Sequence, residues 1–194
     1  MVMNLLELHL NNNEIERIEG LENLVELQCL DMSGNRIRKI EGLGSLGELR
    51  SLYLEDNCIE RMEGLDGHPV LEVLDLARNR IAVPDGFDTL PSLAKLDLSG
   101  NPIRRFWGLH RAPALSALVL HRVDLEKTFL RDVGGVDDWG FANDVKAFKD
   151  LCRNREAKKG RGIAAAKALV RGAGSVPVRY LCLALGVALG DIYV

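Results

Sequence analysis

The sequence has 194 residues, of which 47% are hydrophobic, 27% charged and only 5% aromatic, and its formal net charge is −3. A chain of this length buries a sizeable core, and the composition is typical of a soluble globular protein filled by aliphatic side chains. The apolar run at residues 180–190 is shorter than the roughly 18 to 20 residues of a membrane span. The composition therefore excludes an obvious membrane protein.

Two further features indicate an intracellular location. The first repeat starts at once after Met1, without the basic and apolar regions of a secretory signal peptide. The four cysteines, Cys29, Cys58, Cys152 and Cys182, lack the paired spacing of a metal site. We expect a reducing intracellular compartment such as the cytoplasm, although the spacing leaves a disulfide open.

Asparagine recurs every 22 residues, at Asn13, Asn35, Asn57, Asn79 and Asn101. Leu or Met stands eight, five and three residues before each Asn, Ile stands two residues after it, and Gly stands seven residues after it. A fixed period with the pattern L-x-x-L-x-L-x-x-N is the signature of leucine-rich repeats, whose units stack to build one continuous core. The predicted fold is therefore an α/β, right-handed leucine-rich-repeat solenoid.

The period explains these residue types. Leu8 and Leu10 alternate with His9 as in a half-buried strand, so a parallel sheet should line the concave face. A unit of 22 residues leaves little room for a full helix, so short 3₁₀ or single helical turns are expected on the convex face. The Asn ladder should satisfy backbone groups buried in each turn. The recurring Gly suits either a positive φ or a close approach of the next coil.

Residues 1–130 are predicted to form the solenoid, with five full repeats and a degenerate sixth in which Val123 replaces the Asn. Residues 131–194 form a separate loop and helical segment. Phe141, Val145, Phe148 and Cys152 follow a helical spacing, which favours an amphipathic helix that could cap the solenoid. A second helix is expected at Ile163–Arg171. At the other end only Met1–Asn4 precede an apolar coil, so either a partner covers that edge or the chain is a fragment.

The exposed strand positions of successive repeats form columns on the concave face. The predicted partner-binding residues in these columns are His9, Asp31, Tyr53, Glu55, Asp75, Lys95, Asp97 and His121. Neighbouring Asp75 and Asp97 should repel one another, and a basic partner would relieve that repulsion. The alternative is that these carboxylates are merely solvated.

No catalytic, metal or cofactor site is predicted. Asp75 and Asp97 on an open sheet should lack the desolvation that tunes a catalytic carboxylate, and nothing nearby completes a metal-ligand set. The segment Gly160–Ala165 matches the dinucleotide pattern G-x-G-x-x-A, but no strand precedes it, so a joint between helices is favoured. We therefore expect a non-enzymatic protein without a small-molecule substrate.

The charge is unevenly distributed. Residues 1–140 contain 24 acidic and 15 basic side chains, whereas residues 141–172 contain 3 acidic and 9 basic ones. The basic segment runs from Lys146 to Arg161 and could contact RNA, which makes a ribonucleoprotein component the alternative function. Stacking aromatic residues are not interleaved with these charges, so a solvated helix face is favoured and nucleic acid is an unfavoured partner.

The unit N-x-I-x-x-I-x-G-L-x-x-L, found at Asn13–Leu24 and Asn35–Leu46, resembles the 22-residue repeats of the nuclear regulatory subunit of type-1 protein phosphatase. Similar units occur in the leucine-rich light chain of outer-arm dynein, in other axonemal proteins and in the A-prime protein of a spliceosomal ribonucleoprotein. The resemblance covers residues 4–126. It implies a eukaryotic adaptor whose concave face binds a protein partner, such as a phosphatase catalytic subunit or a dynein or other axonemal protein.

Overall fold

The computed structural model describes residues 4–104, 106–123, 145–146, 149–150, 152–153 and 157. The chain divides into two compact units, Met1–Cys152 and Arg153–Val194. The fold described here is that of the first unit. The predicted boundary at residue 130, the loop before residue 141, the helix at Ile163–Arg171 and the motif at Gly160–Ala165 lie outside the described residues.

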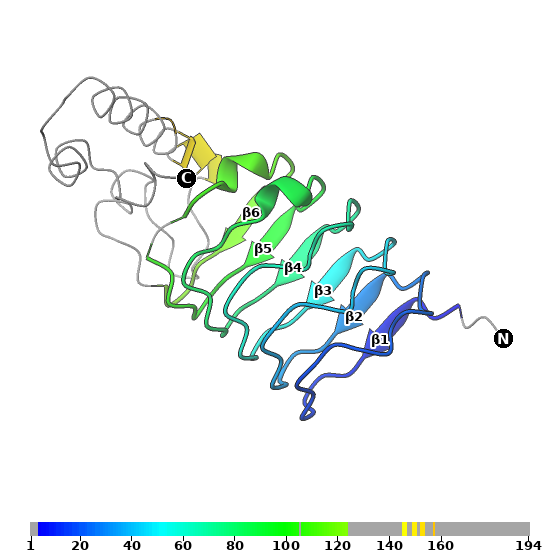
Figure 1. Ribbon diagram of the computed structural model, residues 1–194. Coiled ribbons are helices and arrows are strands. Elements are labelled where there is room, and N and C mark those ends of the chain that lie inside the picture. Colours follow the sequence, from blue (N-terminus) through cyan, green and yellow to red (C-terminus); the bar gives the residue numbers. More distant parts are fainter. Residues whose placement is uncertain are drawn as a thin grey trace, which may run out of the picture. The chain divides into compact units, whose positions relative to one another are not determined.

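Six short parallel strands form one sheet in chain order (Figure 1). They are β1 (Glu7–His9), β2 (Cys29–Asp31), β3 (Ser51–Tyr53), β4 (Val73–Asp75), β5 (Lys95–Asp97) and β6 (Ala117–Val119). Each strand pairs with the next in a constant register of 22 residues, so that Leu8 pairs with Leu30 and Leu30 with Leu52. This sheet confirms the predicted solenoid. We call its turns coils 1 to 6, starting at Leu5, Leu27, Leu49, Leu71, Leu93 and Leu115; the first five have 22 residues, and coil 6 is described as far as Val123.

The side of the coils opposite the sheet consists of tight turns and two 3₁₀ helices. These helices are η1 (Phe87–Thr89) in coil 4 and η2 (Leu109–Arg111) in coil 5, and each follows a glycine with a positive φ. Elsewhere a single turn replaces them, as where the Leu24 N–H donates to the Leu21 carbonyl at 3.0 Å. The short convex turns confirm the expectation from the length of the repeat.

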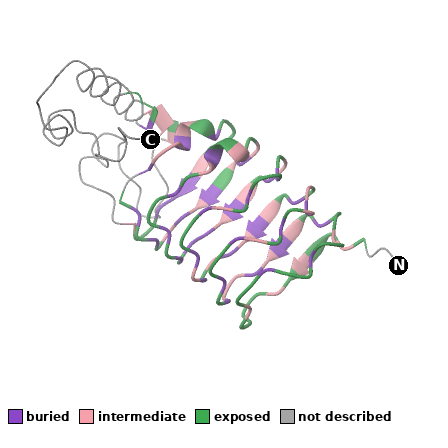
Figure 2. Cartoon of the chain, viewed as in Figure 1, coloured by how far each residue is buried: buried purple, intermediate pink, exposed green. Residues whose placement is uncertain are grey.

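The core lies between the sheet and the turns, and inward side chains of every coil fill it (Figure 2). In coil 3, Leu52 and Ile59 are completely buried. Their equivalents in coil 1, Leu8 and Ile15, are only partly buried, because no coil among the described residues packs on the outer side of coil 1. The same repeat pattern of Leu, Asn, Ile and Gly therefore gives different degrees of burial along the solenoid.

The Asn ladder links each coil to the one before it. The Asn57 Oδ1 accepts the Ile37 N–H at 2.9 Å, and its Nδ2 donates to the carbonyls of Met32 and Leu54 at 3.0 and 3.1 Å. Asn35, Asn79 and Asn101 repeat these bonds. Asn13 is exposed and donates only to carbonyls of its own coil. Four of the five asparagines thus join two coils.

The recurring glycine meets both conditions that the sequence left open. Gly42 and Gly64 each have a φ of +71°, and a Cβ atom on either would collide with a carbonyl of the preceding coil, that of Ile18 or Ile40. The left-handed backbone and the close approach therefore occur at the same position.

Residues from the predicted amphipathic helix lie against the last coils. Val145 packs on the core, and the buried Cys152 thiol lies 3.6 Å from the Phe106 carbonyl oxygen. Lys149 Nζ donates to the carbonyls of Pro113 and Leu115 at 3.3 and 3.0 Å. One lysine of the predicted basic segment is thus engaged with the solenoid itself.

Candidate partner-binding face

All eight predicted partner-binding residues belong to the sheet or to the residues that directly follow its strands. His9, Asp31, Tyr53, Asp75 and Asp97 are the last residues of β1 to β5, and Lys95 is the first residue of β5. Glu55 and His121 each follow a strand by two residues. Their side chains project from the face opposite the core, which we call the sheet face.

The N-terminal part of the sheet face combines a histidine with two acids. The His9 Nε2 lies 3.7 Å from a Glu7 carboxylate oxygen, and its Nδ1 lies 3.8 Å from Asp31 Oδ2. The imidazole is more than half exposed, so the group is polar and open to solvent.

The recurring aspartates have a structural role. The Oδ1 atoms of Asp31, Asp75 and Asp97 each accept the backbone N–H of the residue two positions later, at 2.9, 3.0 and 2.9 Å. Such a bond fixes the turn that leaves the strand. It uses one carboxylate oxygen, so the other oxygen of Asp75 and of Asp97 is available to a binding partner, whereas Asp31 Oδ2 faces His9.

Asp75 differs from the sequence-based expectation. Burial raises its pKa from 3.8 to about 6, the Ala77 N–H lowers it, and the charges of Asp97 and Glu55 raise it further. The expectation that an open sheet leaves this carboxylate without desolvation was therefore wrong. The neighbouring strands and side chains cover part of Asp75, so ionisation of its carboxyl near neutral pH costs free energy.

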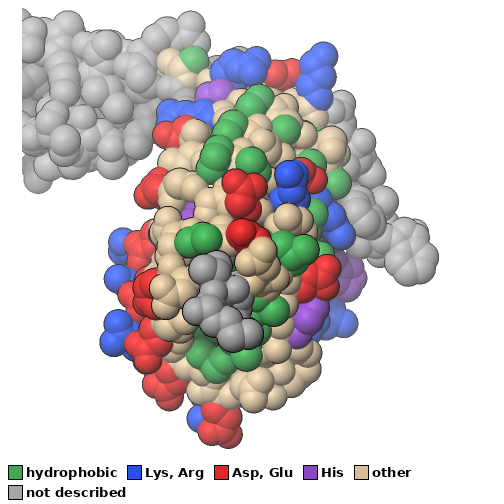
Figure 3. Space-filling model, turned by 90° about the vertical axis from the view of Figure 1, so that its right-hand side faces the viewer, with side chains coloured by type: hydrophobic (Ala, Val, Ile, Leu, Met, Phe, Trp, Pro, Cys, Tyr) green, Lys and Arg blue, Asp and Glu red, His purple; other side chains and the backbone are tan. Residues whose placement is uncertain are grey.

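Asp75 and Asp97 are direct neighbours in the sheet, and neither forms an ion pair with another described residue. Elsewhere, successive coils pair their charges. Arg17 contacts Glu41 at 3.1 Å, and Arg50 contacts Glu72 at 2.8 Å. Acidic and basic side chains accordingly lie side by side along one edge of the molecule (Figure 3). Unlike these edge charges, the two central aspartates form no ion pair with a described residue, and the charge of Lys95 offsets only part of the burial and acidic repulsion that raise the Asp75 pKa.

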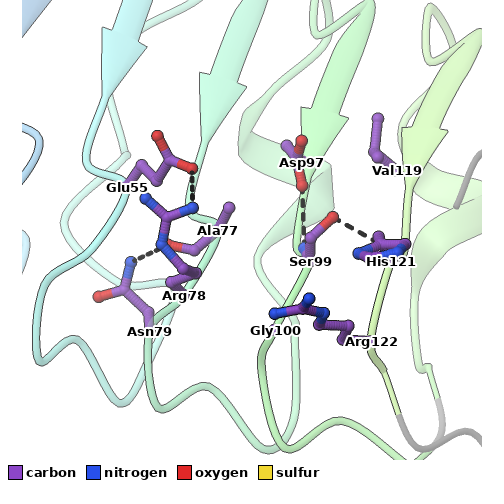
Figure 4. A pocket seen from close by; sticks show the side chains of 10 residues that line it. All are labelled: Glu55, Ala77, Arg78, Asn79, Asp97, Ser99, Gly100, Val119, His121 and Arg122. Atoms are coloured by element: carbon purple, nitrogen blue, oxygen red, sulfur yellow. Dashed lines mark hydrogen bonds and ion pairs between the residues drawn. The ribbon is translucent and has the colours of Figure 1, made fainter. Parts of the chain in front are cut away.

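A hollow of about 900 Å³ lies where β3 to β6 end. Its lining residues include acidic, basic and small side chains, as Figure 4 shows. Arg78 forms ion pairs with Glu55 at 2.9 Å and Asp56 at 3.7 Å. The Ser99 Oγ accepts the His121 N–H at 3.1 Å. Three predicted residues, Glu55, Asp97 and His121, thus line a hollow that the sequence did not predict.

The residue before each Asn of the ladder was missed by the sequence reasoning. This column has a positive φ in every coil, and its members are Asn12, Gly34, Asp56, Arg78, Gly100 and Arg122. Asn, Asp and Gly favour the left-handed conformation, so their recurrence at this position was the available signal. The conformation places Arg78 and Arg122 at the rim of the sheet face.

Cysteine chemistry is disfavoured on this face. Burial raises the pKa of the Cys29 thiol, and the charges of Glu7 and Asp31 raise it further, which keeps the thiol protonated and a poor nucleophile. Cys29, Cys58 and Cys152 are free thiols. Within the part of the chain that the structure describes, no cluster of three or more His, Cys, Asp or Glu side chains could hold a metal ion.

None of the helices among the described residues is long and apolar enough to cross a membrane.

Comparison with known proteins agrees with this architecture. The family described as Leucine Rich repeats (2 copies) matches residues 4–45 and 25–67. A leucine-rich-repeat protein of Leptospira interrogans superposes with a TM-score of 0.60 and 25% sequence identity, over 64% of this chain and 33% of that one. The chain thus has the fold of a leucine-rich-repeat solenoid. A search of curated protein sequences found no match.

Two other solved leucine-rich-repeat structures are similar. The functional domain of InlJ from Listeria monocytogenes, which includes a cysteine ladder, has a TM-score of 0.52 and 25% identity over 62% of this chain and 26% of that one. TLR13, solved in complex with ssRNA13, has a TM-score of 0.55 and 33% identity over 60% of this chain and 18% of that one. The present chain thus spans only about a fifth to a third of the length of these structures.

Proposed function

We propose that this leucine-rich-repeat protein is a non-enzymatic scaffold that binds a protein partner through its sheet face. The observation that carries the proposal is the direct pairing of Asp75 and Asp97, two carboxylates that form no ion pair with another described residue. Like charges opposite each other in a sheet repel. A lysine or arginine of a partner placed between them relieves that repulsion and gains two charge-assisted hydrogen bonds.

The neighbourhood of these aspartates supplies the other components of a protein interface. Tyr53 pairs directly with Asp75 in the sheet, and its half-buried ring offers a rigid aromatic anchor. Val73 lies beside Asp75 on the same strand and adds apolar surface. An aromatic anchor next to desolvated charge is typical of the centre of a protein interface.

The resemblance of the repeat unit favours two kinds of partner. A phosphatase catalytic subunit and a dynein or other axonemal protein are the candidates, and either implies a eukaryotic cell and an intracellular compartment, such as the cytoplasm, cilium or nucleus. RNA is disfavoured as the ligand of the solenoid, because residues 4–123 carry 19 acidic and 13 basic side chains and would repel phosphates. The partner-binding set remains His9, Asp31, Tyr53, Glu55, Asp75, Lys95, Asp97 and His121.

Affinity capture from the native cell extract, followed by mass spectrometry, tests the proposal. The binding variant is Asp75→Lys with Asp97→Lys, and the matched control is Asp66→Lys with Asp88→Lys, which makes the same charge change at exposed residues far from the strands. Partners lost with the binding variant and retained with the control support the sheet face. Partners retained by both variants would move the interface elsewhere.

Recombinant catalytic subunit of type-1 phosphatase and dynein heavy-chain segments then serve as direct ligands in a binding assay. Binding of either one that weakens with Asp75→Lys and Asp97→Lys supports that class of partner. Failure of both ligands removes these two partner classes and leaves the sheet-face proposal to the capture experiment.

A further inference from the structure

Arg78 and Arg122 stand in the same column of the repeat, two coils apart, but their surroundings differ. Arg78 is neutralised by Glu55 and Asp56, which lie 23 and 22 positions earlier in the chain. The residues at the same offsets from Arg122 are Ser99 and Gly100. Beneath Arg122, the two carboxylates are therefore replaced by a hydroxyl and a hydrogen atom.

This exchange leaves room as well as charge. Arg122 is exposed and forms no ion pair with another described residue. The Arg122 side chain extends toward Gly100 in Figure 4, whereas the Ser99 hydroxyl points toward His121. Both Ser99 and Gly100 line the hollow at the end of the strands. The hollow thus contains the guanidinium of Arg122 with open space beside it. Two coils earlier, the carboxylate of Glu55 fills the equivalent space beside Arg78.

We propose that Arg122 binds an acidic side chain of the partner protein, in the position that Glu55 occupies relative to Arg78. The inference rests on the proposed function, since it adds a second contact to the same face. Arg122 presents two N–H groups in a fork that matches a carboxylate. His121, exposed next to Arg122, adds a polar wall.

The geometry specifies the spacing of the two contacts in the partner. Arg122 lies one coil beyond Asp97 and three residues further along the coil, past the end of β6, so the two Cα atoms are at most roughly 11 Å apart for a strand spacing of about 4.8 Å and a rise of about 3.3 Å per residue. An extended peptide covers that distance in three or four residues. The partner segment therefore carries Lys or Arg for Asp75 and Asp97, and Asp or Glu three or four positions away for Arg122.

The test selects binders from a random twelve-residue peptide library displayed on phage, using the immobilised full chain. Ser99→Glu is the decisive variant, because it supplies Arg122 with the internal carboxylate that Arg78 already has and so excludes the ligand. Ser99→Gln is the matched control, with nearly the same size and no charge. Arg122→Gln removes the cation itself, and thermal unfolding checks that each variant is folded.

We expect wild type and Ser99→Gln to enrich Asp or Glu at the predicted spacing by about twofold to fivefold, the range that one exposed ion pair supports. Ser99→Glu and Arg122→Gln should lose this enrichment while the basic residue remains enriched. The same acidic enrichment on Ser99→Glu as on wild type, or no acidic enrichment on wild type, would overturn the proposal.

A parallel selection on Asp75→Asn with Asp97→Asn separates this inference from the proposed function. Loss of the basic residue with retention of the acidic one supports both contacts. Basic enrichment that survives these substitutions, or no enriched peptide on wild type, contradicts the sheet-face function itself. A synthetic version of an enriched peptide, with phosphoserine or serine in place of the acidic residue, then distinguishes a phosphate from a carboxylate as the preferred anion.

Discussion

Coil 1 and coil 3 carry the same sequence frame but differ in what surrounds it. Leu52 is fully buried and Asn57 is 7% exposed, whereas Leu8 is partly buried and Asn13 is exposed. The difference arises because coil 3 has a described coil on both sides and coil 1 on one side only. The contribution of a frame residue to stability is thus set by its neighbouring coils, as expected for a solenoid whose stability is a sum of units and interfaces.

The largest expected effect is that of truncating the core of coil 3. Leu52→Ala removes a completely buried side chain between two coils and should lower the free energy of unfolding by about 2 to 5 kcal/mol. Leu8→Ala removes the equivalent side chain where it is only partly buried, and should lower it by less than half as much. Denaturant unfolding of both variants measures the difference. Equal losses would show that the two coils are equally supported.

The second comparison concerns the glycine column. Gly64→Ala places a methyl group against the Ile40 carbonyl at a φ of +71°, whereas at Gly20, with a φ of +78°, nothing lies within 4 Å of such a group. Both changes should cost about 1 to 2 kcal/mol for the left-handed backbone. Gly64→Ala should cost a further 1 to 3 kcal/mol or so for the collision. Matched unfolding midpoints for the two variants would argue against close approach of the coils.

The third comparison tests the Asn ladder between coils. Asn57→Ala leaves the Ile37 N–H without its acceptor and removes one of the two side-chain hydrogen bonds to the Met32 carbonyl, so it should destabilise by about 1 to 3 kcal/mol. Asn13→Ala breaks only bonds within its own exposed turn and should cost less than about 1 kcal/mol. Thermal unfolding under identical conditions resolves the two. A loss at Asn13 as large as that at Asn57 would contradict a ladder that acts between coils.

Most of the fold could be predicted from the sequence because the residues that determine it recur in every repeat. Each leucine, asparagine and glycine of the frame meets the same geometry in every coil, so five copies of one pattern outweigh the weak propensity of any single segment. The convex 3₁₀ turns followed from the repeat length alone. Which coil buries its frame completely could not be read from the sequence, because burial depends on what stacks against each end.

The candidate site was predictable only in part. The columns of the sheet face followed from strand periodicity, but the partial burial of Asp75 did not, because it depends on the side chains that surround it. His68 was also missed. It is buried, and its Nδ1 and Nε2 lie 3.0 Å from the carbonyl oxygens of Leu65 and Leu43, which joins coils 2 and 3. Because histidine does not recur at this position in the other repeats, the 22-residue pattern gave no indication of the role of His68.

The smallest expected effect concerns the charge of Asp75 on the sheet face, where the coils differ in sequence. Asp75→Asn keeps an acceptor for the Ala77 N–H but removes the charge. The pKa of Asp75 is raised from 3.8 to about 6 in the folded protein, chiefly by burial. Folding therefore favours the protonated form. Stability from this group is fully present below pH 3.8 and is lost as the pH rises through about 6.

Asp75→Asn should accordingly match the wild type near pH 4 and be more stable above pH 7. A shift of this size corresponds to about 3 kcal/mol, and solvent screening of a half-exposed carboxylate reduces the expected gain to about 1 kcal/mol. Urea unfolding from pH 4 to pH 8 measures the gain, and Asp75→Ala, which also removes the acceptor, should be less stable than Asp75→Asn at every pH. A gain independent of pH would mean that the charge of Asp75 is fully solvated, and would remove the repulsion that favours a basic partner on this face.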